Sequence, residues 1–344
     1  MSLFKDWQWQ PPSDWQRIST VDMHTGGEPL RVVTAGLPPI EGRTVLEKRR
    51  YFREHLDHLR TGLMWEPRGH ADMYGAIVTP SLDADADVFF LHNEGYSTMC
   101  GHAVLALTKL LLETGLVVRP GPAPVIALNA PCGRIEASAV VENGLVVRSS
   151  FRCVPSFLYL RDRELDVPGV GRVRFDVAYG GAFYAVVDAP ALGLGLDAAN
   201  FGRLVEVGRR IKHAVMAAQA IKHPFEEELS FLYGTIFTGP AHEAGHHSRN
   251  VCIFADGEVD RSATGSGVSA RAALHHAKGE LPLGETIVIE SITGSTMSVR
   301  AIEAVKFGPH DAVIPEVGGS AAFTGRHEFW FDPADPFRAG FIFR

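Results

Sequence analysis

The sequence predicts an α+β fold of two similar units, each a twisted β-sheet around one central helix. Most of the 344 residues form short strand-like runs, broken by many of the 35 glycines and 21 prolines. Residues 101–115 are apolar on nearly every side of a helix, and residues 267–281 are rich in small side chains, so both helices belong in an interior. Each lies between runs of strands, which predicts two units of one design.

The length of the chain suits two domains, because a domain of roughly 150 residues can bury about 70% of its extended-chain surface. The turn-rich residues 152–157 are the expected crossing between the two domains. We expect the first domain to comprise residues 17–157 and to be closed by a C-terminal strand within 326–344. The second domain then comprises residues 158–325.

The individual elements follow from their side-chain patterns. Residues 31–39, 124–151 and 285–305 have the alternation and the Gly or Pro punctuation of strands and turns. Residues 41–60 place Leu46, Phe52, Leu56 and Leu59 at roughly helical spacing, which predicts a surface helix that packs through one face. Against this background, convincing amphipathic helices are few.

Composition excludes several classes of protein. The net charge of −7 argues against nucleic acid or an anionic membrane as the main partner. The four cysteines form no CxxC pair, which favours free thiols in a reducing compartment, and we expect Cys132, Cys153 and Cys252 to be buried and inert. Neither a signal peptide nor a run of 18 apolar residues is found, so we expect a cytoplasmic protein. Its partner is a small-molecule substrate, and a homodimer is left open.

The stretch "STMCGHAVLAL" (97–107) places a thiol and an imidazole at a helix start. The first N–H groups of a helix are unpaired and the macrodipole is positive there, so a carboxylate or phosphate binds well. The same field favours a thiolate at Cys100. Gly101 permits close approach of a ligand, and His102 offers a hydrogen bond. The alternative is a structural cysteine that caps the helix beside a core histidine.

A second stretch, "DRSATGSG" (260–267), repeats this layout with Thr264 in the place of the cysteine. It is another Gly-rich helix start, with Asp260 before it and Ser266 after it. If the two helix starts face each other, together they can hold one small carboxylate.

Six stretches of the chain resemble the proline racemase superfamily, and most closely its branch of trans-3-hydroxy-L-proline dehydratases. They run nearly end to end: "DMHTGGEPLRVV" (22–33), "EPRGHADMYGA" (66–76), "MCGHAVLAL" (99–107), "GGAFYAVVD" (180–188), "HSRNVCIF" (247–254) and "DRSATGSGVSAR" (260–271). The resemblance implies the diaminopimelate-epimerase-like fold, with two pseudo-symmetric domains and the active site in the cleft between them. It also implies a reaction without cofactor or metal ion.

The racemases of this family carry cysteine at both helix starts, and the two thiols work on opposite faces of the α-carbon. Here Cys100 is present but Thr264 replaces the second cysteine, and a threonine hydroxyl cannot act as an acid or base of the thiol kind. A single base suits elimination, because in trans-3-hydroxy-L-proline the hydroxyl and the α-hydrogen lie on the same ring face. We therefore expect a hydro-lyase that forms pyrroline-2-carboxylate, with the Cys100 thiolate removing the α-proton.

The remaining site residues have roles that follow from this hypothesis. Backbone N–H groups of Gly101, His102, Gly265 and Ser266 would surround the carboxylate and stabilise the carbanion. By family analogy, Asp260 and His102 would bind the ring nitrogen. Thr264 would orient the substrate or its hydroxyl. The acid that protonates the leaving hydroxyl stays open, with Cys100 itself first and His102 second.

Three alternatives remain. Racemisation or 2-epimerisation of proline or hydroxyproline requires Thr264 to hold a water that serves as the acid. The stretch "HEAGH" (242–246) matches a zinc-protease pattern, but Gly239, Pro240 and Gly245 favour a polar loop over the helix that this pattern needs. A catalytically inactive amino-acid-binding protein is the third.

Three further stretches border the expected site. Residues 24–29 predict a tight turn, from which His24 or Thr25 can reach the cleft. In residues 68–75 we expect Asp72 and Tyr74 to be structural hydrogen-bonding groups. In residues 180–185 the two glycines suggest close approach of a ligand, whereas Phe183 and Tyr184 belong to the core.

Overall fold

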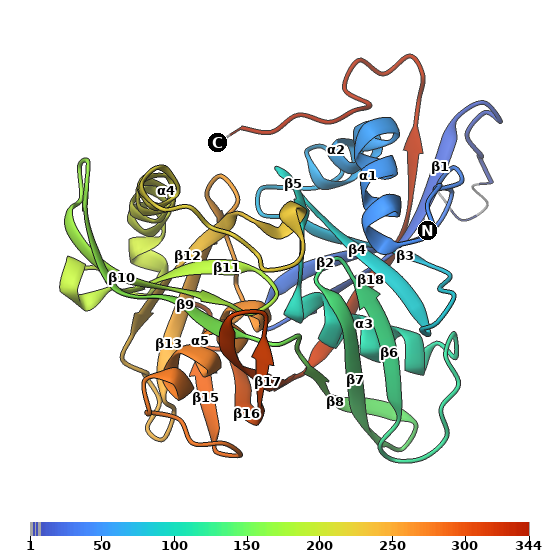
Figure 1. Cartoon of the computed structure of the whole chain (residues 1–344). Coiled ribbons are helices and arrows are strands. Elements are labelled where there is room, and N and C mark those ends of the chain that lie inside the picture. The colour runs from blue at the N-terminus through green and yellow to red at the C-terminus, as the bar shows by residue number, and fades with distance from the viewer. Residues whose placement is uncertain (1–2, 4, 6–7, 344) are drawn as a thin grey trace.

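The structure is a computed structural model that describes residues 3, 5 and 8–343 of the chain (Figure 1). Its eighteen strands form one continuous, strongly curved sheet in the described residues, and this sheet wraps around two helices. We call the two parts of the molecule the first half (β1–β8 and β18) and the second half (β9–β17). They are joined where β17 pairs antiparallel with β8.

The first half surrounds helix α3 (Gly101–Glu113), and α1 and α2 pack outside the sheet. Its elements are β1 (Gln16–Thr25), β2 (Glu28–Ala35), α1 (Val45–His55), α2 (Asp57–Met64), β3 (Tyr74–Thr79), β4 (Ala86–His92), β5 (Gly95–Ser97), β6 (Val125–Ala130), β7 (Gly133–Glu142), β8 (Leu145–Arg152) and β18 (Ala321–Phe331). Strand β18 pairs with β1 along its whole length, from Gln16 opposite Phe331 to Thr25 opposite Ala321.

The second half surrounds helix α5 (Gly265–Ala277), with α4 (Phe201–Ala218) packed outside against β12 and β13. Its strands are β9 (Phe157–Val167), β10 (Gly171–Tyr179), β11 (Phe183–Asp188), β12 (Leu232–Gly239), β13 (Ser248–Phe254), β14 (Glu258–Val259), β15 (Thr286–Glu290), β16 (Thr296–Phe307) and β17 (His310–Gly319). Three short 3₁₀ helices, η1 (Pro190–Leu192), η2 (Ala198–Asn200) and η3 (Glu227–Leu229), lie in the connections. The division into residues 17–157 with 326–344 and 158–325 stays a prediction.

The predicted central helices are confirmed. In α3 the side chains of Val104, Leu105 and Leu107 are fully buried, as expected for a helix that is apolar all round. Helix α5 needs its small residues, because the end of β10 passes directly against it. A Cβ on Gly180 would lie 2.2 Å from the carbonyl oxygen of Ser266. Gly180 therefore serves helix packing, and the expected approach to a ligand at this residue is wrong.

The predicted helix over 41–60 is wrong in its extent. The structure has α1 and α2 in its place, separated at Leu56, whose φ of −127° and ψ of 13° interrupt the helix. Phe52, Leu56 and Leu59 are nevertheless buried in a second apolar cluster beneath β3 and β4, so the expected packing face is confirmed.

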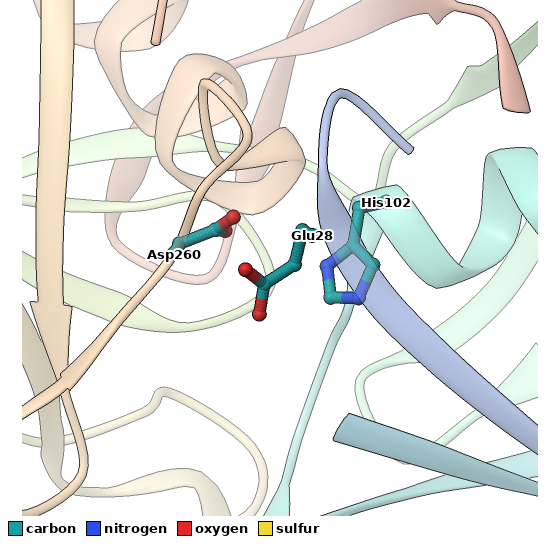
Figure 2. A group of neighbouring side chains, drawn as sticks. All are labelled: Glu28, His102 and Asp260. Carbon is teal, nitrogen blue, oxygen red and sulfur yellow. The ribbon is translucent and has the colours of Figure 1, made fainter. Parts of the chain in front are cut away.

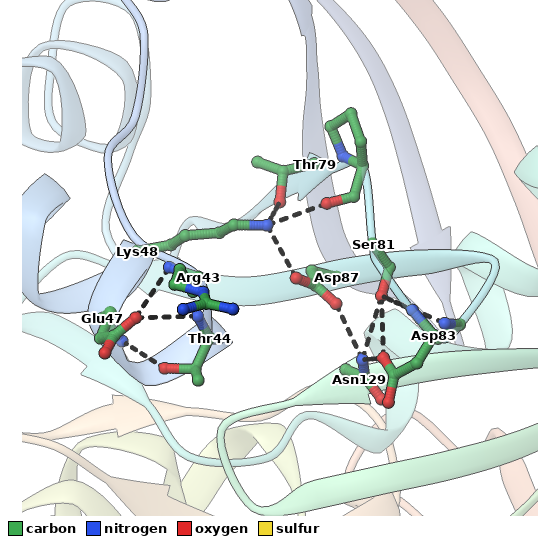
Figure 3. Close-up of polar contacts among 11 residues, drawn as sticks. Arg43, Thr44, Glu47, Lys48, Thr79, Ser81, Asp83, Asp87 and Asn129 are labelled. Atoms are coloured by element: carbon green, nitrogen blue, oxygen red, sulfur yellow. Dashed lines mark hydrogen bonds and ion pairs between the residues drawn. The ribbon is translucent and has the colours of Figure 1, made fainter.

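Side-chain contacts fix the start of α1 and tie it to the sheet (Figure 3). Thr44 and Glu47 form a capping box, in which each side chain accepts a hydrogen bond from the other residue's N–H. Lys48 then reaches the sheet, with its Nζ 2.7 Å from Asp87 and 3.1 Å from the hydroxyl of Thr79. Because this ion pair is buried and hydrogen-bonded, it holds α1 in one position.

The sequence analysis does not single out α4, although its pattern is clear. The buried residues Leu204, Val207, Ile211 and Val215 recur at intervals of three and four, which is the signature of an amphipathic helix. The turn at residues 24–29 is confirmed, since Gly26 and Gly27 have φ of 61° and 92° between β1 and β2. Among the described residues, no helix is both long and apolar enough to span a membrane.

Candidate active site

The first turns of α3 and α5 meet head to head in the centre of the molecule. A Cβ on Gly101 would lie 2.5 Å from the Cα of Gly265, and a Cβ on Gly265 would lie 2.5 Å from the Cα of Gly101. Only glycine allows this approach. The unpaired N–H groups of both helix starts, and the positive ends of both dipoles, therefore converge on the same small space.

A small cavity lies at this meeting point. Its volume is about 20 Å³, which is roughly the room that one water molecule needs. The structure brings all seven predicted site residues together in its wall: Cys100, Gly101, His102, Asp260, Thr264, Gly265 and Ser266. The other lining residues are Tyr74, Met99, Tyr184, Tyr233, Cys252 and Phe254. This cavity is smaller than an amino acid, so a substrate of that size does not fit it in the arrangement that the structure describes.

Cys100 is the N-cap of α3, and its Sγ accepts a hydrogen bond from the N–H of Ala103 at 3.4 Å. The same sulfur lies 3.1 Å from Nδ1 of His102. The structural interpretation of this cysteine as a helix cap is therefore correct in geometry. It does not exclude a chemical role, because Sγ also faces the cavity.

The expected effect of the helix start on the Cys100 thiol is wrong for the closed site. Burial raises the pKa of Cys100 well above the usual value of a thiol, and the carboxylates of Asp260 and Glu28 raise it further. The N–H of Ala103 and the hydroxyl of Tyr74 lower the pKa only in part. Loss of water around the sulfur outweighs the helix dipole here.

Thr264 occupies the corresponding position at the start of α5, but it caps nothing. Its Oγ1 is buried and has no hydrogen-bond partner among the described residues. Its φ of 66° is rare for a β-branched residue, and such a strained conformation is found mainly where surrounding structure and function require it. The hydroxyl is thus left available to a ligand in the cavity.

Cys252, on β13, is the one expected inert thiol that lines the cavity. It is fully buried, and burial raises its pKa well above the usual value, while the Thr264 hydroxyl lowers it in part. Cys153 is buried as expected, and Cys132 is half-buried. Because Cys252 lines the cavity, it is a second thiol near the predicted site.

An ionisable cluster lies at one end of the cavity, where Glu28 comes between Asp260 and His102 (Figure 2). One ligand atom from each of the three lies within 4.8 Å of the others, and all three side chains are buried. Glu28 Oε2 accepts a hydrogen bond from the N–H of Arg261 at 2.7 Å, whereas Oε1 has no partner among the residues described. The cluster suits a small cation, either an ammonium group or a metal ion.

Burial sets the protonation of this cluster. It raises the pKa of Glu28 well above its usual value, and the neighbouring Asp260 carboxylate raises it further. Burial also lowers the pKa of His102. Sequence reasoning missed Glu28, although an ionisable residue that opens the mostly buried strand β2 directly after a two-glycine turn was a usable signal.

Three tyrosines, Tyr74, Tyr184 and Tyr233, also line the cavity. The Tyr184 hydroxyl lies 2.6 Å from Oγ of Ser266, and the Tyr74 hydroxyl is hydrogen-bonded to Oγ of Ser97. The Tyr233 hydroxyl makes no hydrogen bond in the described part of the chain. Tyr74 is a hydrogen-bonding group as expected, and Tyr184 is fully buried, but both also face the cavity. Nothing in the sequence analysis pointed to Tyr233.

Residues 242–246, His24 and Thr25 do not line the cavity. Residues 242–246 form a loop rather than a helix, and their backbone N–H groups and His246 bind the carboxylate of Glu290, so the zinc-protease alternative is wrong. His24 accepts a hydrogen bond from its own turn at Gly27. Thr25 lies beneath the site and donates to the carbonyl oxygen of His102 at 2.9 Å.

Comparison with known proteins shows which family of sequences this chain is similar to. The sequence model of the family described as Proline racemase matches residues 20–342. The trans-3-hydroxy-L-proline dehydratase of Colwellia psychrerythraea is 52% identical over 342 residues, which cover 98% of this chain and 96% of the relative. The Homo sapiens protein of the same name is 49% identical over 339 residues, 95% of each chain.

A solved structure gives the same architecture. It is a hydroxyproline epimerase from Agrobacterium vitis with bound trans-4-hydroxy-L-proline, which superposes with a TM-score of 0.89 at 30% identity and covers 95% of this chain and 96% of its own. This likeness confirms the predicted fold.

Proposed function

The chain belongs to the proline racemase family, and from its single thiol at the two helix starts we propose that it dehydrates trans-3-hydroxy-L-proline. The products are pyrroline-2-carboxylate, formed first as the enamine, and water. This is the activity named for the relatives that share about half of its residues over nearly the full length.

The observation that carries the proposal is the asymmetry between Cys100 and Thr264. Both residues precede the first turn of a central helix and face one cavity, but only Cys100 can become a base at accessible pH. A base on one face removes the α-proton without a partner to deliver a new proton to the other face. Since the hydroxyl of this substrate shares the face of the α-hydrogen, elimination follows.

The helix starts supply the stabilisation that this proton transfer needs. An α-proton beside a carboxylate is very weakly acidic, so the enediolate-like state must be held by preorganised donors, each worth about 3 kcal/mol. The N–H groups of Gly101, His102, Gly265 and Ser266 have no partner within their helices and can surround the carboxylate. Thr264 can orient the ring from the opposite side.

The ring nitrogen fits the ionisable cluster. An ammonium group between Asp260 and His102 gains a charge-assisted hydrogen bond from the carboxylate. Binding of this positive charge also offsets the carboxylate repulsion that opposes ionisation of Cys100. Substrate binding and activation of the base are therefore coupled in the closed site.

One observation favours the epimerase alternative, because Cys252 gives the cavity a second thiol beside Thr264. If this thiol delivers a proton to the opposite face, L-proline or trans-4-hydroxy-L-proline is inverted at Cα. Location in the cytoplasm and assembly into a homodimer also stay predictions.

The test supplies metal-free protein with trans-3-hydroxy-L-proline and follows pyrroline-2-carboxylate by nuclear magnetic resonance, with L-proline and trans-4-hydroxy-L-proline run in heavy water alongside. We expect dehydration, and a loss of 10²- to 10⁴-fold in Cys100→Ser because a hydroxyl is a far poorer base. Cys153→Ser, which replaces a buried thiol outside the cavity, is the matched control and should retain activity.

Two results would contradict the proposal. Absence of dehydration with formation of D-proline or 4-hydroxy-D-proline, lost in Cys252→Ser, would identify an epimerase. Retention of dehydration in Cys100→Ser would place the base on another residue.

A further inference from the structure

Tyr233, on β12, lines the cavity and has a buried hydroxyl without a hydrogen-bond partner among the described residues. Its side chain is 6% exposed. A buried hydroxyl without a partner costs free energy, so native proteins rarely keep one unless a ligand or ordered water completes it. Of the three tyrosines in this wall, the other two have their hydroxyls engaged, by Ser266 and Ser97.

Packing fixes the direction of this hydroxyl. The Tyr233 ring stacks on Phe254 with centroids 5.4 Å apart, and it makes edge contacts with Tyr184 at 5.9 Å and His92 at 6.0 Å. A ring held on three sides cannot turn its hydroxyl away from the cavity without repacking the core. The hydroxyl is therefore positioned before any ligand arrives.

Tyr233 is linked to Cys100 through Tyr74. The Tyr74 hydroxyl lies close enough to the Cys100 sulfur to lower the thiol pKa, and the hydroxyls of Tyr74 and Tyr233 are close enough to perturb each other's pKa. Burial raises the pKa of both phenols well above the usual value, so both carry their protons. The cavity wall thus holds three proton-bearing groups, Cys100, Tyr74 and Tyr233, of which Tyr74 interacts with both of the others.

We propose that Tyr233 is a catalytic residue that donates the proton to the departing 3-hydroxyl, an inference that rests on the proposed dehydration. The 3-hydroxyl lies on the same ring face as the α-hydrogen, so its proton donor must lie on the Cys100 side. Thr264, at the other helix start, faces the opposite side of the ring. His102 is committed to the nitrogen end of the site and to Cys100.

The proton balance closes within the site. The Cα–H bond breaks, its proton passes to Cys100 Sγ, and its electron pair is held in the enediolate-like state. That pair forms the Cα=Cβ bond as the Cβ–O bond breaks with its pair on oxygen, which takes the Tyr233 proton and leaves as water. The Tyr233 phenolate recovers a proton from Tyr74, and Tyr74 recovers one from the Cys100 thiol. All three groups return to their starting states.

The test compares Tyr233→Phe with the wild type in two reactions of the full chain. Dehydration of trans-3-hydroxy-L-proline should fall 10²- to 10⁴-fold, the range of general acid catalysis. Exchange of the α-proton of L-proline in heavy water, which needs Cys100 but has no leaving group, should stay within threefold. Tyr179→Phe is the matched control, since Tyr179 also has a buried hydroxyl without a partner among the residues described, but lies outside the cavity.

A substrate with chloride in place of the 3-hydroxyl, trans-3-chloro-L-proline, separates acid catalysis from a structural effect. Chloride leaves as an anion and needs no proton, so the ratio of wild-type to Tyr233→Phe rates should fall towards one.

The inference is overturned if Tyr233→Phe dehydrates within threefold of the wild type, because the acid is then Cys100 or another group. It is also overturned if Tyr233→Phe loses α-proton exchange and dehydration to the same extent. The same holds if the ratio of wild-type to Tyr233→Phe rates is as large with the chloride substrate as with the hydroxyl substrate. Absence of dehydration in the wild type would instead refute the proposed function itself.

Discussion

At the level of single residues, burial keeps the thiol of Cys100, the carboxyl of Glu28 and the cavity phenols protonated. Burial raises the pKa of Cys100 and of Glu28, and the same loss of water keeps Tyr74 and Tyr233 as phenols. When a substrate with an ammonium group and a carboxylate binds, protons can pass from these groups to one another and to the substrate. The chemistry is therefore set by desolvation as much as by the choice of side chains.

The raised pKa of Cys100 predicts an alkaline dependence of activity. Below that pKa the thiolate fraction rises about tenfold per pH unit, so kcat/KM of the free enzyme should rise with nearly that slope from pH 6.5 to 8.5. The measurement is initial dehydration rates at low substrate concentration, with preincubation at each pH to show that the protein survives. A flat profile over this range would mean that Cys100 is already ionised in the resting enzyme.

Glu28 predicts a dependence of stability on pH. Its pKa is higher in the folded protein than the usual 4.5 of the unfolded chain, so the folded state binds the extra proton and wild-type stability falls as pH rises above 4.5. Glu28→Gln removes this dependence. The variant should therefore gain stability relative to wild type by about 1.4 kcal/mol per pH unit until the folded-state pKa is reached.

Urea unfolding of both proteins at pH 4.5 and pH 8 checks this expectation. Glu227→Gln, at an exposed position, is the control and should show no such difference. If the difference in unfolding free energy between Glu28→Gln and wild type is the same at both pH values, the pKa of Glu28 is not raised in the folded protein.

At the level of elements, the two central helices share a design but differ in how they are packed. Helix α3 fills its half with Val and Leu side chains, whereas α5 uses Gly, Ser and Ala so that β10 and β17 can pass close to it. What both need is a glycine at the first helical position. The pair Gly101 and Gly265 sets the distance between the two helix starts, and hence the geometry of the proposed carboxylate site.

Gly265→Ala should separate the helix starts. The new Cβ would lie 2.5 Å from the Cα of Gly101, so the backbones must move, and a misplacement of about 1 Å costs roughly 10²-fold in rate. We expect kcat/KM to fall at least that far. Gly202→Ala, where a Cβ meets no atom within 4 Å in the first turn of α4, should keep full activity and gain about 0.5–1 kcal/mol of stability. Unchanged rates in Gly265→Ala would show that the contact is not needed.

At the level of the whole molecule, polar contacts hold the two halves closed over the cavity. Arg261 of the second half binds Asp72 of the first at 2.5 Å, and His92 lies 2.9 Å from Glu258. The hydroxyl of Ser295 donates to the carbonyl oxygen of Gly26 at 2.9 Å. If substrate enters between the two halves, these contacts must break or shift. Closure excludes water from the cavity and strengthens each electrostatic interaction inside it.

Asp72→Asn should shift the molecule towards the open state. Loss of a charge-assisted contact of about 1 kcal/mol predicts roughly a fivefold fall in kcat/KM and a faster reaction of Cys100 with a thiol-alkylating reagent. Asp256→Asn breaks an exposed ion pair with Arg209, neither residue of which lines the cavity, and is the control. If alkylation of Cys100 is equally slow in both variants, the Asp72 pair does not govern closure.

The sequence by itself determined the features that a few neighbouring residues encode. The two helix starts with Cys100 and Thr264, the glycine turn before Glu28, and most strands follow from local spacing and backbone preference. The seven site residues were found in this way because each belongs to one of two short segments. Helix α4 was encoded equally well by its 3–4 periodicity but was not recognised.

Only the tertiary structure decided what surrounds those segments. Tyr233 and Cys252 come to the cavity wall from β12 and β13, and Glu28 comes from β2 to the neighbouring cluster with His102 and Asp260. No local pattern announces which face of a buried strand will meet a distant helix. The raised pKa of Cys100 has the same origin, because desolvation sums contacts from the whole fold, whereas the opposing helix dipole arises within a single turn.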